Sequence, residues 1–173
     1  GATICLPRKP DCRNCPVAKF CLALANGTQE ERPVMKPKPE VPHVTVTAAV
    51  IQREDEVLLA QRPSNGLLGG MWEFPGGKQE PGESLSACLE REIREELGVG
   101  IQVGVEIGVF RHAYTHFRVT LHAFTCSLDG NMPRAIEVQD VRWVELGELE
   151  KYPMGKIDRQ IAKILITNVT SQL

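Results

Sequence analysis

The sequence predicts a mixed α/β fold, a sheet flanked by helices, preceded by a short cysteine-rich metal-binding segment. Runs rich in valine and threonine alternate with helical patterns along the larger, C-terminal part of the chain. Four of the six cysteines lie between residues 5 and 21, and this spacing indicates metal ligands more than disulfides. Apolar residues make up 42% of the 173 residues, which is enough to build a sizeable core.

Composition divides the chain into three parts: a cysteine-rich segment at 1–26, a linker at 27–42 and a larger domain at 43–173. The linker contains four prolines and has no apolar periodicity. Residues 1–42 hold 7 Lys and Arg against 4 Asp and Glu, whereas residues 43–173 hold 13 against 18. The basic front part suggests contact with a polyanion, although such a charge is commonly only a solvated surface.

No apolar run is long enough to cross a bilayer, and no segment resembles a secretory signal. The longest apolar pieces are short and strand-like, such as Val44 to Ile51. We therefore expect a cytoplasmic protein without a membrane partner.

The larger domain is predicted to begin with a hairpin. Strands are expected at His43 to Gln52 and Glu56 to Arg62, around the polar turn Arg53 to Asp55. A glycine-rich loop then leads into Met71 to Phe74, and a wide loop follows that contains Pro75-Gly76-Gly77 and Pro81-Gly82.

A helix from about Ser84 to Leu97 has the clearest signals in the chain. Ser84 is suited to cap its start, Gly98 to close its end, and apolar residues recur every four positions at Leu85, Leu89, Ile93 and Leu97. Strands are expected at Ile101 to Arg111, His116 to Ser127 and Asp140 to Val144, and a last helix from about Lys156 to Ile166.

Acidic residues on the first of these helices point to a metal site. At about 100° per residue, Glu92 and Glu96 fall beside the apolar stripe and Glu95 lies one step further round. Carboxylates packed together near an apolar surface repel one another, and a divalent ion such as Mg²⁺ would relieve the repulsion. Gly76 and Gly77 would let the backbone approach a phosphate or a metal. The alternative is an exposed helix with salt bridges.

Residues 77–99, GKQEPGESLSACLEREIREELGV, match the Nudix box, G-x5-E-x7-R-E-U-x-E-E-x-G-U with U apolar, at every specified position. The resemblance implies a Nudix fold, an α/β/α sandwich, and hydrolysis of a nucleoside diphosphate linked to another moiety. It also implies that the Gly76 carbonyl, Glu92, Glu95 and Glu96 hold Mg²⁺ or Mn²⁺. Arg91 would orient the glutamates, and Glu83 would be a supporting acid.

The cysteines Cys5, Cys12, Cys15 and Cys21 form the pattern C-x6-C-x2-C-x5-C. Four thiolates suit tetrahedral zinc or a 4Fe–4S cluster. The spacing resembles the iron–sulfur loop that closes the helix-hairpin-helix DNA glycosylase domain, which favours the cluster and keeps zinc as the alternative. Basic residues of such a loop contact DNA or are ordinary surface charge; here they are Arg8, Lys9, Arg13 and Lys19. Cys88 and Cys126 stand in apolar contexts and are assigned no function.

Two further stretches are similar to adenine DNA glycosylases of the MutY type, whose C-terminal domain is Nudix-like. These are NGLLGGMWEFPGGK and Tyr114-Thr115-His116, which aligns with the loop that reads 8-oxoguanine opposite adenine. The resemblance implies that a glycosylase domain lies upstream and that DNA containing 8-oxoguanine is a partner. Tyr114 and His116 would otherwise be a strand-end aromatic residue and a satisfied histidine.

The stretch YPMGKIDRQIAKIL resembles the closing helix of MutT-type 8-oxo-dGTP hydrolases, in which an Asn or Asp contacts the purine; Asp158 stands at that place. Asp158 would accept hydrogen bonds from guanine, or act only as a helix cap. Glu137 or Asp140 would supply a further catalytic carboxylate.

Two functions therefore stay open. The first is hydrolysis of 8-oxo-dGTP to 8-oxo-dGMP and pyrophosphate, with Gly77 and the Tyr114–His116 segment near the nucleotide. The second is recognition of 8-oxoguanine in DNA without hydrolysis.

Overall fold

The computed structural model describes residues 3–32, 34 and 41–170, and the side chains only as far as residue 167. The chain divides into two compact units, Gly1–Glu40 and Val41–Leu173, and each is described by itself. No helix in the described part of the chain combines the length and the apolar character that a membrane span requires.

The first unit consists of short helical turns. It contains 3-10 helices at Cys12–Asn14, Ala18–Phe20 and Gln29–Glu31, and the four-residue helix α1 at Leu22–Ala25. The Asp11 side chain caps the first turn by accepting a hydrogen bond from the Asn14 amide. The Gln29–Glu31 turn falls within the expected linker, of which residues 33 and 35–40 lie outside the described residues. At the other end of that linker, the Pro42 carbonyl accepts from the Arg118 amide at 2.8 Å.

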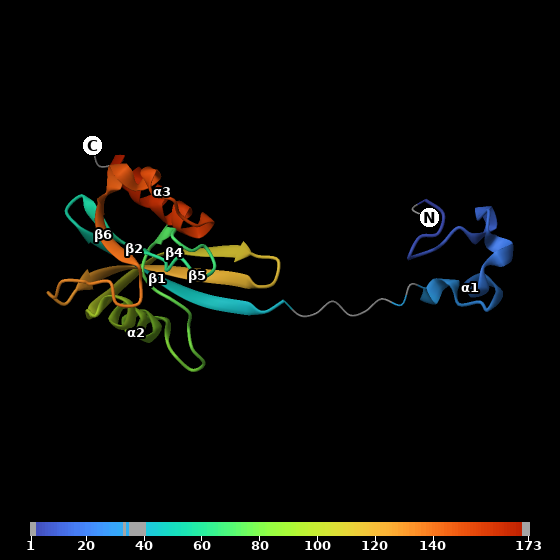
Figure 1. Ribbon diagram of the computed structural model, residues 1–173, viewed down its shortest axis with the longest axis horizontal. Helices are drawn as coiled ribbons and strands as arrows, with labels where there is room; N and C mark the ends of the chain where they lie inside the picture. The colour runs from blue at the N-terminus through green and yellow to red at the C-terminus, as the bar shows by residue number, and fades with distance from the viewer. Residues whose placement is uncertain (1–2, 33, 35–40, 171–173) are drawn as a thin grey trace. The chain divides into compact units, whose positions relative to one another are not determined.

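The second unit is built on a mixed sheet of six strands (Figure 1): β1 (His43–Arg53), β2 (Glu56–Gln61), β3 (Trp72–Glu73), β4 (Ile101–Ala113), β5 (Arg118–Leu128) and β6 (Asp140–Glu145). The order is β3-β2-β1-β5-β4, and β6 also pairs with β2. β1 runs parallel to β5, whereas the hairpins β1–β2 and β4–β5 are antiparallel. The parallel pair brings the two hairpins together into one sheet.

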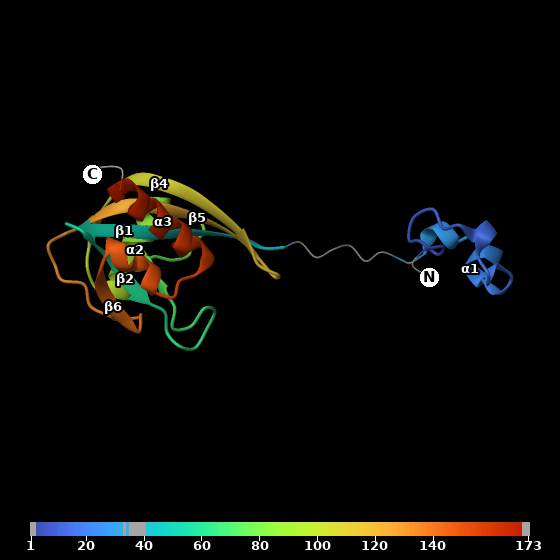
Figure 2. The ribbon, with the colours of Figure 1, turned by 90° about the horizontal axis from the view of Figure 1, so that it is seen from above.

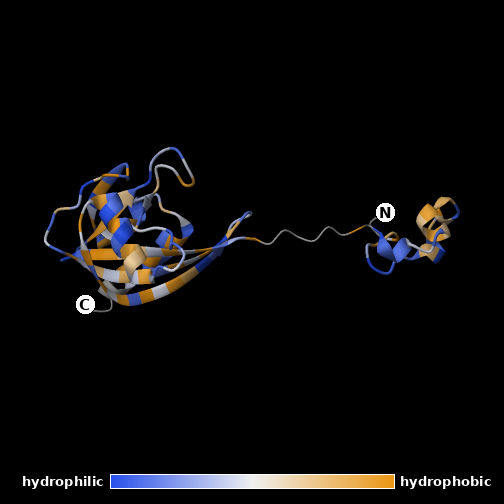
Figure 3. Ribbon diagram, turned by 90° about the horizontal axis from the view of Figure 1, so that it is seen from below, coloured by the Kyte–Doolittle hydropathy of each residue, from blue (hydrophilic) through white to orange (hydrophobic). Residues whose placement is uncertain are grey.

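Two helices cover opposite faces of this sheet (Figures 1 and 2): α2 (Leu85–Leu97) and α3 (Lys156–Thr170). Leu89, Ile93 and Leu97 of α2 pack against one set of β1 residues, which includes Ala49 and Ile51. Ile157 and Ile161 of α3 pack on the other side of the sheet against the alternate set, Ala48 and Val50. Because successive strand residues point to opposite faces, β1 belongs to both cores and is buried on both sides. The outward surface of α2 is mostly hydrophilic (Figure 3).

The sequence signals of α2 are confirmed. Ser84 caps the helix by accepting from the Ala87 amide, and Gly98 ends it in the left-handed conformation with φ +68°. The β4–β5 turn differs from expectation, because β5 begins at Arg118 and residues 114–117 form a tight turn instead of a strand end. The Tyr114 amide donates to the Phe117 carbonyl at 2.8 Å and closes this turn.

Candidate active site

A cavity of about 370 Å³ opens between the start of α3, the β4–β5 turn and the glycine loop before α2. Its lining includes the carboxyl groups of Glu73, Glu92 and Glu96. It also includes Asp158, apolar side chains and the aromatic rings of Phe74, Tyr114 and Phe117. The cavity therefore combines carboxyl groups with apolar and aromatic walls.

The glycine loop is held against β1 by backbone hydrogen bonds. The Thr47 amide donates to the Gly77 carbonyl and the Ala49 amide to the Pro75 carbonyl, both at 2.8 Å. Gly76 has φ +146°, and a Cβ there would collide with the backbone of Thr47 and Ala48. Only glycine allows this approach. Among the described residues nothing donates to the Gly76 carbonyl, which leaves it available to a metal ion.

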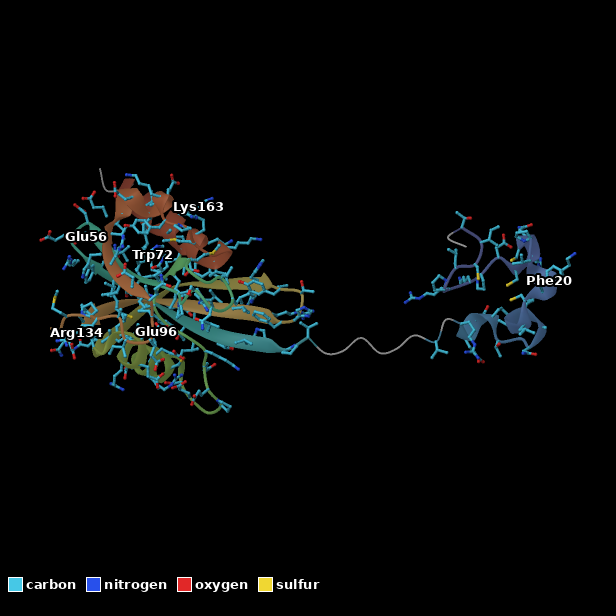
Figure 4. All side chains as sticks on the ribbon, in the orientation of Figure 1. Phe20, Glu56, Trp72, Glu96, Arg134 and Lys163 are labelled. Carbon is cyan, nitrogen blue, oxygen red and sulfur yellow. The ribbon has the colours of Figure 1, made fainter. Side chains whose placement is uncertain are left out.

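The loop brings backbone groups to two glutamates of α2. Glu96 lies on the side of α2 that faces the sheet (Figure 4) and accepts a hydrogen bond from the Gly76 amide at 3.1 Å. The carboxylate of Glu92 packs directly on Gly77, where any Cβ would overlap it. Both side chains line the cavity, so the helix and the loop together define this acidic part of it.

Burial makes this region unfavourable for negative charge. Burial raises the pKa of Glu96 to about 8, and the neighbouring charge of Glu73 adds to the effect. Burial likewise raises the pKa of Glu73 to about 7, although its ion pair with Arg62 works in the opposite direction. A divalent cation would offset this repulsion, and a donor set made only of oxygens suits Mg²⁺ or Mn²⁺.

The structure brings together only some of the metal ligands that the sequence predicts. In the described ranges, no three or more His, Cys, Asp or Glu side chains are grouped closely enough to hold an ion. Glu92 and Glu96 line the cavity together with Gly76, whereas Glu95 does not line it and its side chain is 47% exposed. The donors that fit Mg²⁺ at the cavity wall are therefore two carboxylates and the Gly76 carbonyl.

Arg91 forms hydrogen bonds with several acidic side chains. Its guanidinium binds both oxygens of Glu83 at 2.9 and 3.0 Å, Glu92 at 2.9 Å and Glu95 at 3.1 Å. It also donates to the Lys78 carbonyl at 3.1 Å, which fixes the loop to the helix. The hydrogen bonds from Arg91 are the main reason that the pKa of Glu83 falls to about 2. Arg91 thus fixes the position of the Glu92 carboxylate.

Asp158 and the aromatic side chains of the cavity are suited to a planar base. Asp158 Oδ1 accepts from the Phe74 amide at 3.2 Å, and burial raises the pKa of Asp158 to about 6. Tyr114 and Phe117 stack on each other at 4.7 Å between ring centroids and also line the cavity. A ring between these walls would meet a carboxyl group that accepts hydrogen bonds when ionised and donates one when protonated.

Several expected residues lie elsewhere. Thr115 and His116 are exposed in the β4–β5 turn and do not line the cavity. Glu137 and Asp140 do not line it either, and Asp140 accepts from the Val141 amide and from Arg142, both at 2.9 Å.

A further carboxylate that lines the cavity is Glu73, which the sequence analysis missed together with its partner Arg62. The sequence did contain a signal, because Glu73 stands between two large aromatic residues, Trp72 and Phe74. Both of these residues are buried in the structure.

In the first unit, all four clustered cysteines line a second cavity, of about 240 Å³. The six cysteines of the chain are free, so no disulfide competes for these thiols. Burial raises the pKa of Cys12, and the charges of Cys21, Cys15 and Cys5 raise it further. The Oε1 atom of Gln29, which also lines the cavity, is buried and has no hydrogen-bond partner among the described residues. In the described part of the chain, however, these four thiols are not grouped closely enough to hold a metal ion.

Comparisons with known proteins agree with this geometry. The model of the NUDIX domain family matches residues 46–163. The CTP pyrophosphohydrolase of Escherichia coli K12 is 37% identical over 115 residues, covering 66% of this chain and 85% of that protein. The putative 8-oxo-dGTP diphosphatase 2 of Mycobacterium tuberculosis is 38% identical over 121 residues, with coverage of 66% and 82%.

The match to another relative includes the first unit. Human adenine DNA glycosylase is 25% identical over 211 residues; the match covers 95% of this chain but only 39% of that protein.

Among solved structures, that of the E. coli ORF135 protein superimposes with a TM-score of 0.62 at 34% identity, covering 74% of this chain and 91% of that one. The MutT protein of Methanosarcina mazei Go1 gives a TM-score of 0.66 at 27% identity, with coverage of 75% and 96%. The family match spans the strands, the glycine loop and both helices that build the cavity, and on this evidence the chain belongs to the Nudix family of hydrolases.

Proposed function

We propose that this chain is a Mg²⁺-dependent pyrophosphohydrolase that cleaves 8-oxo-dGTP to 8-oxo-dGMP and pyrophosphate. The observation that carries the proposal is the single cavity that joins Glu92, Glu96 and the Gly76 carbonyl to the pocket around Asp158. A nucleoside triphosphate has the same two parts, a charged phosphate chain and a planar base.

Different residues of the cavity would bind the metal, position a ligand and accept a proton. Glu92, Glu96 and the Gly76 carbonyl would hold the metal, and Arg91 keeps Glu92 in position. When bound, the cation neutralises phosphate oxygens and lowers the pKa of the attacking water. Water attack on phosphorus breaks a phosphoanhydride bond, and the pyrophosphate leaves. Glu73, with a pKa of about 7, is suited to accept the proton released near neutral pH.

Positive side chains are available for the phosphate chain. Arg62, Lys78 and Lys156 line the same cavity as the carboxylates. Because the cavity carries both signs of charge, the triphosphate would contact these cations and the metal together.

The part of the cavity around Asp158 supports a guanine derivative. Ionised Asp158 accepts hydrogen bonds, and the Watson–Crick edge of guanine presents two N–H groups to such an acceptor. The similarity to a putative 8-oxo-dGTP diphosphatase supports this substrate. The similarity to a CTP pyrophosphohydrolase makes CTP the competing candidate, since its exocyclic amine is also a donor.

The test is pyrophosphate release from 8-oxo-dGTP, dGTP and CTP by the full chain, with Mg²⁺, with Mn²⁺ and with EDTA. Glu92→Gln is the loss-of-function variant, and Glu90→Gln on the same helix is its matched control, because Glu90 does not line the cavity. We expect activity only with metal, a loss of about 100-fold or more in Glu92→Gln, and wild-type rates in Glu90→Gln. A preference for CTP would overturn the substrate assignment, and no release from any nucleotide would overturn the hydrolase assignment.

The match to adenine DNA glycosylases, which includes the first unit, favours a second candidate. In it, the chain recognises 8-oxoguanine in DNA through Tyr114, Thr115 and His116 and acts with a glycosylase domain of a longer protein. Its test is the affinity for duplexes with and without 8-oxoguanine opposite adenine; equal affinities would overturn it.

For the four cysteines of the first unit we propose a 4Fe–4S cluster. The spacing of Cys5, Cys12, Cys15 and Cys21 resembles the iron–sulfur loop of DNA glycosylases, and the match to an adenine DNA glycosylase includes this unit. Iron, sulfide and zinc analysis of the purified full chain decides between the two metals, and zinc at one equivalent without iron would contradict the cluster.

A further inference from the structure

A second groove lies on β1, β4 and β5, outside the cavity described above. It has a volume of about 440 Å³ and is lined by His43, Arg111, His112, Ala113, Arg118, Val119 and Thr120. Val119 is the only residue that also lines the substrate cavity. Neither the proposed hydrolysis nor the proposed contacts of the β4–β5 turn use this groove.

The strand register places three basic side chains on one face of the sheet. His43 pairs with Arg118 across the parallel strands β1 and β5. Arg111 pairs with Thr120, two residues from Arg118, across the antiparallel strands β5 and β4. Residues two apart on a strand share a face, so the guanidinium-bearing residues are diagonal neighbours, about 7–8 Å apart. The three basic residues thus form a row that crosses three strands.

The alternate residues of the same strands face the substrate cavity. Val44, Tyr114 and Leu121 line that cavity, and His43, Arg111, Arg118 and Thr120 line the groove, whereas Val119 lines both. Val119 lies between the two sites, which otherwise have no lining residue in common.

The positive charge of this groove is not balanced by the protein. Within the described ranges neither Arg111 nor Arg118 forms an ion pair, and no acidic residue lines the groove. Glu106, the one acidic residue of β4, pairs with His122 at 2.5 Å. His43 is fixed in the groove wall, because its Nε2 atom lies 2.9 Å from the hydroxyl of Thr120.

We propose that the groove binds the phosphodiester backbone of a nucleic acid. Guanidinium groups bind phosphate oxygens in a bidentate manner, and two of them at this spacing are placed for one phosphate or for two successive phosphates. A row of basic residues across three strands suits an extended chain of phosphates better than a single small anion. Contacts of this kind position a nucleic acid without reading its sequence. The inference goes beyond the proposed hydrolysis and does not depend on it.

The test compares two double variants of the full chain with equal net charge. Arg111→Gln/Arg118→Gln removes two charges from the groove, and Arg134→Gln/Lys163→Gln removes two exposed charges elsewhere (Figure 4), from the loop before β6 and from α3. Binding of a fluorescent DNA duplex is followed by anisotropy over a range of salt concentrations. Hydrolysis of 8-oxo-dGTP and far-ultraviolet circular dichroism show whether each variant is folded.

We expect the groove variant to bind the duplex about tenfold more weakly at low salt. The slope of log K against log salt should become shallower by about 1.8, which corresponds to the loss of two phosphate contacts on a duplex. The control variant should keep the wild-type slope, and neither variant should change the hydrolysis rate.

Three results would overturn the inference. The first is an equal slope of log K against log salt in the two variants, and the second is no duplex binding by the wild-type chain. The third is a groove variant that loses affinity for inorganic tripolyphosphate but not for the duplex. The last would identify a small-anion site. None of these results depends on hydrolysis, so the groove and the active site are tested separately.

Discussion

The contact between Gly77 and Glu92 gives the sharpest test of the active-site geometry. A Cβ at residue 77 would overlap the Glu92 carboxyl group and touch no backbone atom among its nearest contacts. Real Cβ contacts are no shorter than 3.0 Å, so in Gly77→Ala the carboxylate must move by about 1 Å. Because Arg91 donates a hydrogen bond to Glu92 at 2.9 Å, this movement also disturbs that hydrogen bond. A displacement of about 1 Å at a reacting centre costs about 100-fold in rate.

The assay is steady-state pyrophosphate release with saturating Mg²⁺, accompanied by thermal unfolding. The matched control is Gly147→Ala, since an added Cβ there meets nothing within 4 Å and no positive φ is involved. We expect kcat to fall by about 100-fold in Gly77→Ala, while its melting temperature stays close to that of the control, because the flexible end of a side chain yields. If kcat stays within about twofold of the control, the position of the Glu92 carboxylate against Gly77 is not what catalysis requires, and this prediction is wrong.

Three further predictions concern the same region. Gly76→Ala should destabilise the fold by about 2 kcal/mol or more, since its Cβ would strike the backbone of β1 at φ +146°; a melting temperature equal to that of Gly77→Ala would contradict this. Glu73→Gln should lower the pKa of Glu96, because the charge of Glu73 helps to raise it; a carboxyl ¹³C titration without metal measures the change, and an unmoved titration refutes the coupling. Glu73, Glu96 and Asp158 have pKa values of about 7, 8 and 6, above the value of about 4 in the unfolded chain. Their contribution to stability is therefore complete below about pH 4 and is lost as the pH rises through these values. In EDTA the melting temperature should rise as the pH falls from about 8.5 to about 5.5, and Mg²⁺ should flatten the trend; a fall over this window would show that these carboxyls are not the controlling groups.

The sequence by itself determined the local features of the active site. The cap at Ser84, the four-residue apolar repeat and Gly98 defined α2, and the structure forms it at Leu85–Leu97. The period of that helix also placed Glu92 and Glu96 beside its buried stripe, and both line the cavity. These features depend on residues close in the chain, whose geometry is set by the helix itself.

Only the tertiary structure decided which distant residues complete the site. The parallel pairing of β1 with β5 brings Tyr114 and Phe117 to the same cavity that Glu92 and Glu96 of α2 line. Strand periodicity says which face a residue occupies but not which strand will be its neighbour, so Glu73 was missed and Glu137 and Asp140 were proposed without support from the fold. The raised pKa values of Glu73, Glu96 and Asp158 have the same origin, because burial depends on packing between segments that lie far apart in the sequence.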